Sequence, residues 1–301
     1  MKVKKILILG GTGMLGHVLF TQLSLRKDLD VHATARTPVN LDRWFSPEIR
    51  PGIITGVDAN DLDTIHHALA SVRPDTVINC IGLIKQSPTA SDPLPAIAIN
   101  ALLPHQISLA CRAAGIRLIH ISTDCVFDGM KGDYNEDDPS DAKDLYGRSK
   151  YLGETTYPHC ITLRTSVIGH ALNHRLGLID WFLAQEGKIR GYTRAIFSGL
   201  PTVELARVIA DHVLPDADLS GLYHVSSEPI SKHDLLRAVA ERYGKRIEIE
   251  PVDDIVLDRS LNSSLFQRKT GYRPSSWPDL ADRMYRHYVR FGYDEKSLTH
   301  G

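Results

Sequence analysis

Short apolar runs alternate with amphipathic helical stretches along the first half of the chain. The runs that suit buried parallel strands occupy residues 3–9, 31–35, 77–81, 117–122 and 161–164. They are continuous rather than alternating, as expected for strands that are covered on both faces. The stretches with helical periodicity occupy residues 14–26, 62–72 and 101–114. This order of elements predicts an α/β fold, in which crossover helices join the strands of a parallel sheet.

The alternation weakens after residue 168, where the remaining elements are more widely spaced. Helices are predicted at 203–213, from Ser231 onward and at 277–291, and strands at 222–225 and 246–251. Ser231 followed by Asp234 is typical of a capping box, which satisfies free N–H groups at a helix start. We expect the strand at 222–225 to return to the main sheet. Trp181 lies in an apolar run, and we expect it in the core rather than at a stacking surface.

A glycine-rich turn follows the first predicted strand and opens a helix. Its glycines at 10, 13 and 16 suit a tight turn, a bare backbone facing a pyrophosphate and close packing of helix on strand. The free N–H groups of the helix N-terminus would then bind the phosphates. The residues of this turn that we expect to bind a dinucleotide are Gly10, Thr12, Gly13, Met14, Leu15 and Gly16.

The residue after the second strand indicates which dinucleotide is preferred. NAD-binding proteins usually place an acidic residue there to hold the ribose hydroxyls, whereas this chain has Arg36. A guanidinium can pair with a 2′-phosphate, so we expect NADP(H) to be preferred, with NAD(H) as the alternative cofactor. The competing interpretation of Arg36 is a surface arginine without a ligand. Asp58 either accepts a hydrogen bond from the adenine amino group or is an ordinary loop residue.

A phenol and an ammonium group stand four residues apart, at Tyr146 and Lys150, and therefore share one face of a helix. Hydride transfer to a carbonyl leaves an oxyanion, which a phenol can protonate if a nearby cation stabilises its ionised form. The hydroxyls of Ser122 and Thr123, at a strand end, can bind the same oxygen. This constellation predicts an oxidoreductase.

Together these motifs resemble the extended short-chain dehydrogenase/reductase family. The resemblance is carried by the glycine turn, the segment STDCVFDG at 122–129 and YGRSK at 146–150. The last two, with residues 199–227, look like the dTDP-4-dehydrorhamnose reductase group within that family. The resemblance implies NAD(P)H-dependent reduction of a 4-keto-6-deoxysugar carried on a nucleotide, with Thr123, Tyr146 and Lys150 as catalytic residues.

The resemblance also implies the fold and its division. We expect a Rossmann-type doubly wound parallel sheet formed by residues 1–168 with 199–227. A smaller C-terminal α/β lobe that binds the substrate would comprise residues 169–198 with 228–301. The chain departs from the group's pattern after the fourth strand, where it has NCIGLIKQ at 79–86, and at Cys125, where an aromatic residue is common.

Further site residues follow from position in such a fold. We expect Cys80, Ile81, Gly82 and Asn100 to contact the cofactor, although N-capping is an equal alternative for Asn100. Tyr146 and Lys150 are expected to contact it as well, with Lys150 holding the nicotinamide ribose. Substrate contacts are expected from Thr123, Asp124, Arg194 and Arg259. Arginine suits a diphosphate by bidentate pairing, and surface ion pairs are the alternative for both arginines. His170 and His174 have HxxxH spacing, but no third ligand is apparent, so we expect no metal site.

Composition narrows the remaining possibilities. Hydrophobic residues make up 43% of the 301 residues, and the formal charge of −1 favours neither nucleic acid nor membrane as a partner. The four cysteines are widely spaced and no export signal is apparent, so we expect reduced thiols in a cytoplasmic protein. A homodimer is compatible with this pattern. The alternative functions are an epimerase or dehydratase with tightly bound NAD, or a non-catalytic regulatory subunit.

Overall fold

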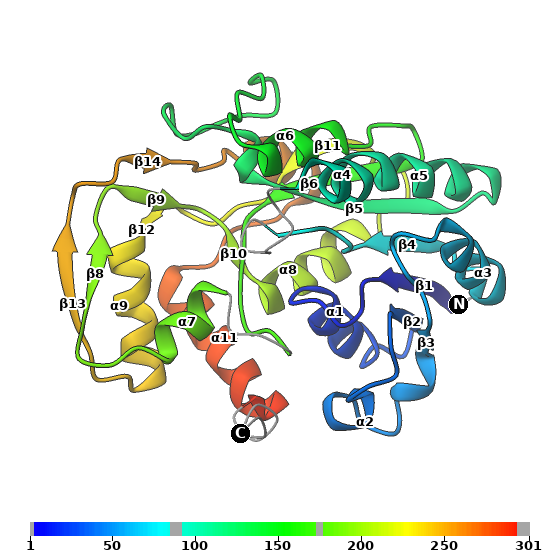
Figure 1. Cartoon of the computed structure of the whole chain (residues 1–301), viewed down its shortest axis with the longest axis horizontal. Helices are drawn as coiled ribbons and strands as arrows, with labels where there is room; N and C mark the ends of the chain where they lie inside the picture. The colour runs from blue at the N-terminus through cyan, green and yellow to red at the C-terminus, as the bar shows by residue number, and fades with distance from the viewer. Residues whose placement is uncertain (1–2, 85–91, 173–176, 294–301) are drawn as a thin grey trace.

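A seven-stranded parallel sheet forms the centre of the main domain. The computed structural model describes residues 3–84, 92–172 and 177–293. The sheet has the order β11-β6-β5-β4-β1-β2-β3 (Figure 1). Its strands are β1 (Lys4–Leu9), β2 (Leu29–Ala35), β3 (Ile53–Thr55), β4 (Thr76–Asn79), β5 (Arg117–Thr123), β6 (Cys160–Thr165) and β11 (Gly221–His224). The order reverses between β1 and β4, which places a ligand crevice at the carboxyl ends of these two strands.

Helices cover both faces of this sheet. Successive strand residues point to opposite sides, so apolar residues on both sides must be buried. In β1, Ile6 and Ile8 pack on one face with α1 (Gly16–Leu23) and α8 (Thr202–Val208). Leu7 and Leu9 pack on the other face with α3 (Leu62–Val72) and α5 (Leu103–Ala113). The expected doubly wound architecture is confirmed.

One long helical segment runs against the second face and begins earlier than expected. The sequence pattern predicts a helix from residue 101, but α4 (Pro93–Pro95), η2 (Ala96–Leu102, a π-helix) and α5 form a continuous run. The Asp92 side chain caps its start by accepting from Leu94 N. Residues 93–113 are long and apolar enough to span a membrane by length and composition alone, and half of the most apolar window is buried within the protein. That burial on the sheet is typical of a core helix.

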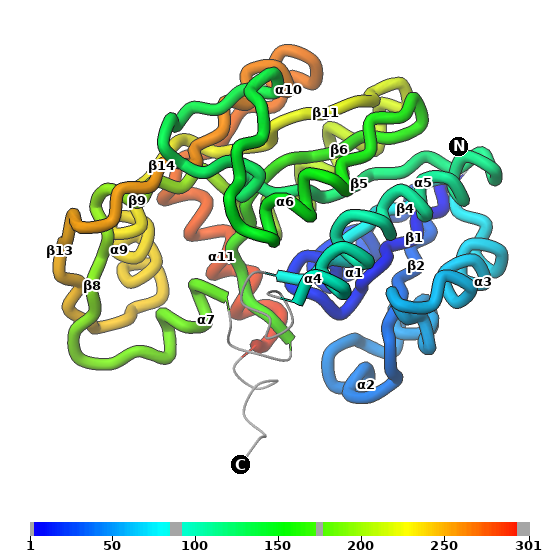
Figure 2. Tube along the Cα trace, turned by 45° about the horizontal axis from the view of Figure 1, so that its top comes forward, coloured from blue at the N-terminus to red at the C-terminus, as the bar shows by residue number. Residues whose placement is uncertain are grey.

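Small strands and α9 (Lys232–Tyr243) form a lobe beside the main sheet (Figures 1 and 2). One small sheet pairs β8 (Lys188–Tyr192) with β13 (Glu248–Val252), and another has β9 (Ala195–Phe197) between β12 (Ile230–Ser231) and β14 (Leu257–Asp258). The predicted capping box is confirmed, since Asp234 N donates to Ser231 Oγ at 3.0 Å.

The remaining elements connect the strands of the main sheet or lie around the smaller lobe. They are α2 (Leu41–Trp44), η1 (Arg50–Gly52), η3 (Asp124–Val126), α6 (Leu145–Leu152), β7 (Val167–Ile168), α7 (Leu178–Leu183), β10 (Leu200–Pro201), η4 (Ile209–Val213), α10 (Ser264–Thr270) and α11 (Trp277–Phe291). Strands β7 and β10 pair with each other, and α11 packs against both α8 and α9. The domain boundaries given above stay a prediction.

Two expectations about single elements have opposite outcomes. The strand near 222–225 is β11, which joins the sheet edge beside β6 as predicted. The prediction that Trp181 lies in the core is wrong, because its side chain is 41% exposed. Helix α7 turns Ile179 and Phe182 inward instead, and three-residue spacing places these two on one face of a helix while Trp181 faces away.

Candidate active site

The glycine turn, residues 10–16, is shaped by contacts that exclude side chains. Gly10 has φ +81°, a left-handed conformation that glycine adopts at little cost. A Cβ on Gly16 would lie 2.1 Å from the carbonyl oxygen of Gly10, and one on Gly11 would lie 2.6 Å from Ala33 Cβ. Glycine at these positions therefore lets α1 and β2 approach the turn closely.

The turn offers unsatisfied donors at the start of α1. Within the described ranges, no acceptor is found for the backbone N–H groups of Met14 and Leu15. Gly13 is exposed beside them, and a Cβ there would lie 3.3 Å from the Gly10 carbonyl oxygen. Free N–H groups and the positive end of a helix dipole suit a pyrophosphate. The turn therefore fits the dinucleotide that the sequence pattern predicts.

Arg36 and Asp58 follow neighbouring strands on the same side of the sheet. Arg36 comes directly after β2, and its side chain is exposed. Thr34 of β2 contacts the glycine turn, because its carbonyl oxygen accepts from Gly11 N at 2.8 Å. Asp58 lies in the loop after β3, where its Oδ1 accepts from Asn60 N at 2.9 Å. This hydrogen bond is typical of a loop residue. The contact of Asp58 with adenine stays a prediction.

The segment after β4 lies between the glycine turn and Lys150. A Cβ on Gly10 would lie 3.3 Å from the backbone of Cys80, and one on Gly82 would lie 3.9 Å from Lys150 Nζ. Ile81 N donates to Asn79 Oδ1, which holds the segment onto the end of β4. The predicted cofactor residues 80–82 are thus brought together with the turn and with Lys150.

Asn100 is buried inside the long helical segment rather than at its start. Its Oδ1 accepts from Leu83 N at 2.8 Å, and its Nδ2 lies 3.4 Å from Ser149 Oγ of α6. The N-capping alternative is therefore wrong, because η2 begins at Ala96. Asn100 fixes the segment after β4 against the helix that carries Tyr146 and Lys150.

Helix α6 is placed by one cap and two glycines. The Asp144 side chain caps its start by accepting from Gly147 N at 2.8 Å. A Cβ on Gly147 would lie 2.2 Å from Cys125 O, and one on Gly153 would lie 2.0 Å from Asn100 O. Helix α6 can therefore lie directly on η3 at one end and on η2 at the other, which brings Tyr146 to the end of β5.

The ionisable groups of α6 are strongly affected by burial. Burial raises the pKa of Tyr146 above its usual range, and nearby Cys125 adds to the rise, whereas the Thr123 hydroxyl acts against it. Part of Tyr146 nevertheless stays accessible to solvent. Burial lowers the pKa of Lys150 to about 8, although Glu154 and Cys80 act in the opposite direction. Tyr146 is thus protonated at neutral pH, which is the form that a general acid requires.

Thr123 and Asp124 lie at the junction of β5 and η3. Both are almost buried, and Thr123 Oγ1 donates to Asp124 Oδ1 at 3.1 Å while it accepts from Cys125 N at 3.1 Å. Burial raises the pKa of the Asp124 carboxyl, although the charge of Arg259 acts against this. Lys150 Nζ donates to the carbonyl oxygen of Ile121, two residues before Thr123. The three expected catalytic residues therefore converge on the end of β5.

The two predicted substrate arginines have different surroundings. Arg259 follows β14 and reaches back to the main domain, where its Nε donates to Phe127 O at 2.8 Å and its Nη1 lies 3.7 Å from Cys125 Sγ. Arg194 is exposed in the turn between β8 and β9. Arg259 is thus brought to the catalytic loop, whereas the substrate role of Arg194 stays a prediction.

A buried ionic network behind Thr123 was not expected from the sequence. Glu154 accepts from Ser122 Oγ at 2.7 Å and from Arg164 Nε and Nη2 at 2.8 and 2.7 Å. The Arg164 guanidinium also lies over the Phe127 ring, with 5.2 Å to its centroid. Such a pair is costly to bury unless its hydrogen bonds are satisfied, as they are here. Glu154 directly follows Gly153, the residue that ends α6, and no local pattern in the sequence indicated its pairing with Arg164.

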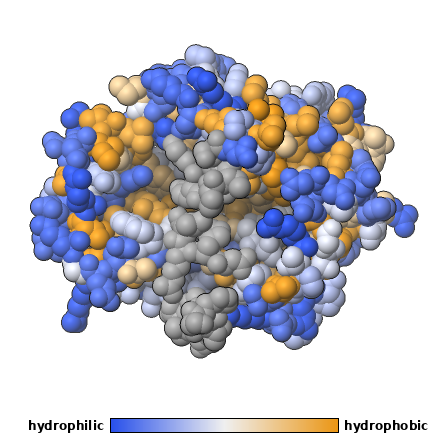
Figure 3. Space-filling model, viewed as in Figure 1, coloured by the Kyte–Doolittle hydropathy of each residue, from blue (hydrophilic) through white to orange (hydrophobic). Residues whose placement is uncertain are grey.

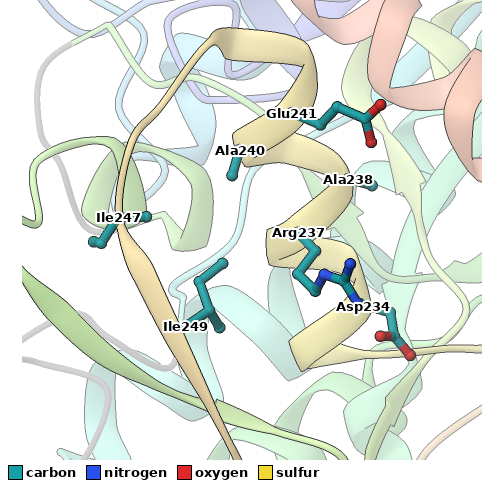
Figure 4. Close-up of a pocket in the computed structure, with 7 residues that line it drawn as sticks. All are labelled: Asp234, Arg237, Ala238, Ala240, Glu241, Ile247 and Ile249. Carbon is teal, nitrogen blue, oxygen red and sulfur yellow. The ribbon is translucent and has the colours of Figure 1, made fainter.

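Two other sequence features lie apart from these residues. His170 Nδ1 faces Asp180 Oδ1 at 2.6 Å and its Nε2 faces the Tyr243 hydroxyl at 2.9 Å, while His174 falls outside the described residues. A cavity of about 480 Å³ lies between α9 and β13 on the smaller lobe (Figure 4). Its lining residues are Asp234, Arg237, Ala238, Ala240, Glu241, Ile247 and Ile249. It contains none of the residues that we assign to the active site.

Comparison with known proteins agrees with this arrangement. The family model described as RmlD substrate binding domain matches residues 4–288 of the chain. The chain belongs to this family. A dTDP-4-dehydrorhamnose reductase from Mycolicibacterium smegmatis is 31% identical over 249 residues, which cover 80% of this chain and 70% of that protein. The resemblance inferred from the motifs is therefore confirmed.

Two further relatives span nearly the whole chain. The crystal structure of a dTDP-4-dehydrorhamnose reductase from Bacillus anthracis in complex with NADP has a TM-score of 0.77 at 20% identity, covering 95% of this chain and 99% of that one. Methionine adenosyltransferase 2 subunit beta of Danio rerio is 24% identical over 320 residues, which cover 95% of this chain and 94% of that protein. Proteins that resemble this chain over nearly its whole length therefore carry different names.

Proposed function

We propose that this RmlD-family protein is a cytoplasmic NADPH-dependent reductase of a nucleotide-linked 4-keto-6-deoxysugar, in deoxysugar and polysaccharide biosynthesis. The observation that carries the proposal is the convergence of Thr123, Tyr146 and Lys150 beside a turn that fits a pyrophosphate. Relatives named dTDP-4-dehydrorhamnose reductase support the substrate class. Bound NADPH would supply the hydride to the keto carbon.

The residues of the chain would handle the oxygen and its proton. Thr123 would orient the keto oxygen beside the Tyr146 hydroxyl, and Tyr146 would protonate that oxygen as it gains charge. The ammonium of Lys150, held by the Ile121 carbonyl, would stabilise the phenolate that remains. Arg259, which lies at the catalytic loop, would pair with the nucleotide diphosphate. The residues that would hold the cofactor are 10–16, 80–82, Arg36, Asp58, Asn100, Tyr146 and Lys150.

A non-catalytic subunit of the same fold is the second candidate. The match to methionine adenosyltransferase 2 subunit beta over 95% of the chain favours it. The intact trio argues against it, because a binding subunit has no need of a buried lysine one helical turn from a protonated phenol. A dehydratase or epimerase is less well supported, since Asp124 stands beside Thr123 without an adjacent glutamate.

An NADPH oxidation assay with dTDP-, UDP- and GDP-linked 4-keto-6-deoxysugars separates these candidates. The reductase proposal expects stoichiometric NADPH consumption with at least one substrate, and Tyr146→Phe should lower kcat by about 10²-fold while leaving NADPH affinity intact. No consumption with the whole panel would support the non-catalytic subunit. Turnover without net NADPH consumption would instead indicate an epimerase, and loss of water from the parent nucleotide-linked hexose would indicate a dehydratase.

The expected homodimer has a candidate surface on the side of the long helical segment. Large apolar side chains are exposed along it and on the neighbouring α6, and hydrophobic surface gathers there in the upper right of Figure 3. They are Leu94, Ile97, Leu102, Leu109, Tyr151 and Leu152. Contiguous exposed apolar surface is typical of protein interfaces. Light scattering should show that the wild-type protein is a dimer and that Leu152→Glu is a monomer. Val289→Glu, on the remote α11, is the control and should remain a dimer. A monomeric wild type would refute the proposal.

A further inference from the structure

The end of helix α11 reaches the helix that follows the glycine turn. Tyr293 is almost buried, and its hydroxyl lies 2.5 Å from Nε2 of His17, which is fully buried in α1. The His17 ring also contacts the rings of Phe291 and Tyr293. In Figure 1, α11 runs between α7 of the smaller lobe and α1 of the main domain. Two parts of the chain that are 276 positions apart are thus joined directly under the turn.

The chemistry of the partners assigns the protons in this contact. His17 Nδ1 lies 2.8 Å from the Gly13 carbonyl oxygen, which can only accept, so Nδ1 carries a proton. In neutral histidine Nε2 is then an acceptor, and the Tyr293 hydroxyl donates to it. A chain of hydrogen bonds therefore runs from Tyr293 through His17 to the Gly13 carbonyl.

That carbonyl determines the orientation of a donor in the cofactor site. In a planar trans peptide, the C=O of Gly13 and the N–H of Met14 point in opposite directions. Gly13 O also accepts from His17 N at 3.1 Å, so two bonds hold it toward α1. The Met14 N–H, which has no acceptor within the described residues, is then directed away from α1.

We propose that Tyr293 is a positioning residue for dinucleotide binding, acting through His17 on the Gly13–Met14 peptide. The inference rests on the proposed function in that the turn binds a dinucleotide pyrophosphate. Tyr293, which follows α11 directly after Gly292, also links the two parts of the protein, because its ring lies 5.0 Å from that of His170, which faces Asp180 of α7. The C-terminal helix thereby stabilises the cofactor turn from the side of the substrate lobe.

Tyr293→Phe removes the hydroxyl and keeps the ring. Loss of one such bond should weaken binding of NADPH, NADH and ADP-ribose alike, by about 3- to 10-fold each, because all three share the pyrophosphate. The matched control is Tyr243→Phe, which removes a hydroxyl from the same aromatic cluster but from a bond to His170. It should leave all three dissociation constants unchanged, and kcat at saturating NADPH should be unaltered in both variants.

Binding is measured by fluorescence titration for the reduced cofactors and by calorimetry for ADP-ribose, with Tm recorded for each variant. His17→Asn retains a donor for Gly13 and loses the acceptor for Tyr293, so it should reproduce the effect of Tyr293→Phe, and the double variant should be no worse. Unchanged affinity in Tyr293→Phe, or an equal loss in Tyr243→Phe, would overturn the proposal. If the wild type bound neither NADPH nor ADP-ribose, the proposed function itself would fail, and this inference with it.

Discussion

Gly147→Ala should separate activity from cofactor binding, because Gly147 places the helix that carries Tyr146. The added Cβ would lie 2.2 Å from the Cys125 carbonyl oxygen and 2.6 Å from Ala142 Cβ, where ordinary contact begins near 3.4 Å. The start of α6 must therefore move away from η3 by about 1.2 Å. A misplacement of about 1 Å at a reacting group can lower the rate by about 10²-fold. We expect kcat to fall by about 10- to 100-fold while the dissociation constant of NADPH stays within about threefold.

The sign of the stability change provides a second test. Without the clash, alanine in a helix would stabilise the protein by about 1 kcal/mol relative to glycine. Overpacking typically costs about 1–3 kcal/mol, so we expect a lower free energy of unfolding in urea denaturation. Gly177→Ala is the control, since its Cβ would meet nothing closer than 3.5 Å among the residues that the structure describes. A Gly147→Ala variant with a raised Tm and full turnover would refute the proposed placement of α6.

Three further predictions concern single charged side chains. The kcat/KM of the wild-type enzyme should fall as pH rises through about 8, where Lys150 loses its proton. Lys150→Met should lower activity and abolish this fall at alkaline pH. A wild-type profile that does not fall there would contradict the assignment. Arg259→Ala should raise KM for the nucleotide sugar and leave NADPH affinity unchanged, and an unaltered KM in a folded variant would exclude diphosphate pairing. Arg36→Ala should reduce kcat/KM for NADPH by about 10-fold and spare NADH, as expected for lost charge-assisted bonds to a 2′-phosphate; equal losses for both cofactors would remove Arg36 from cofactor selection.

The amino-acid sequence alone determined the elements whose signals are local. Continuous apolar runs indicated β1, β2, β4, β5 and β6, and the capping box predicted the start of α9. The glycine turn was recognisable because its steric requirements lie within seven consecutive residues. Tyr146 and Lys150 were found for the same reason, since a spacing of four on one helix needs no knowledge of the rest of the fold.

The tertiary structure alone decided which distant groups meet. Asn100 lies inside a longer helix than periodicity indicated, and Trp181 faces outward although its neighbours are apolar. The Glu154–Arg164 pair and the Tyr293–His17 bond each join elements whose separation along the chain gives no sign of contact. Hydrophobic periodicity specifies which face of an element is buried, but not which element covers it. The partners of these polar groups therefore follow only from how the helices pack on the sheet.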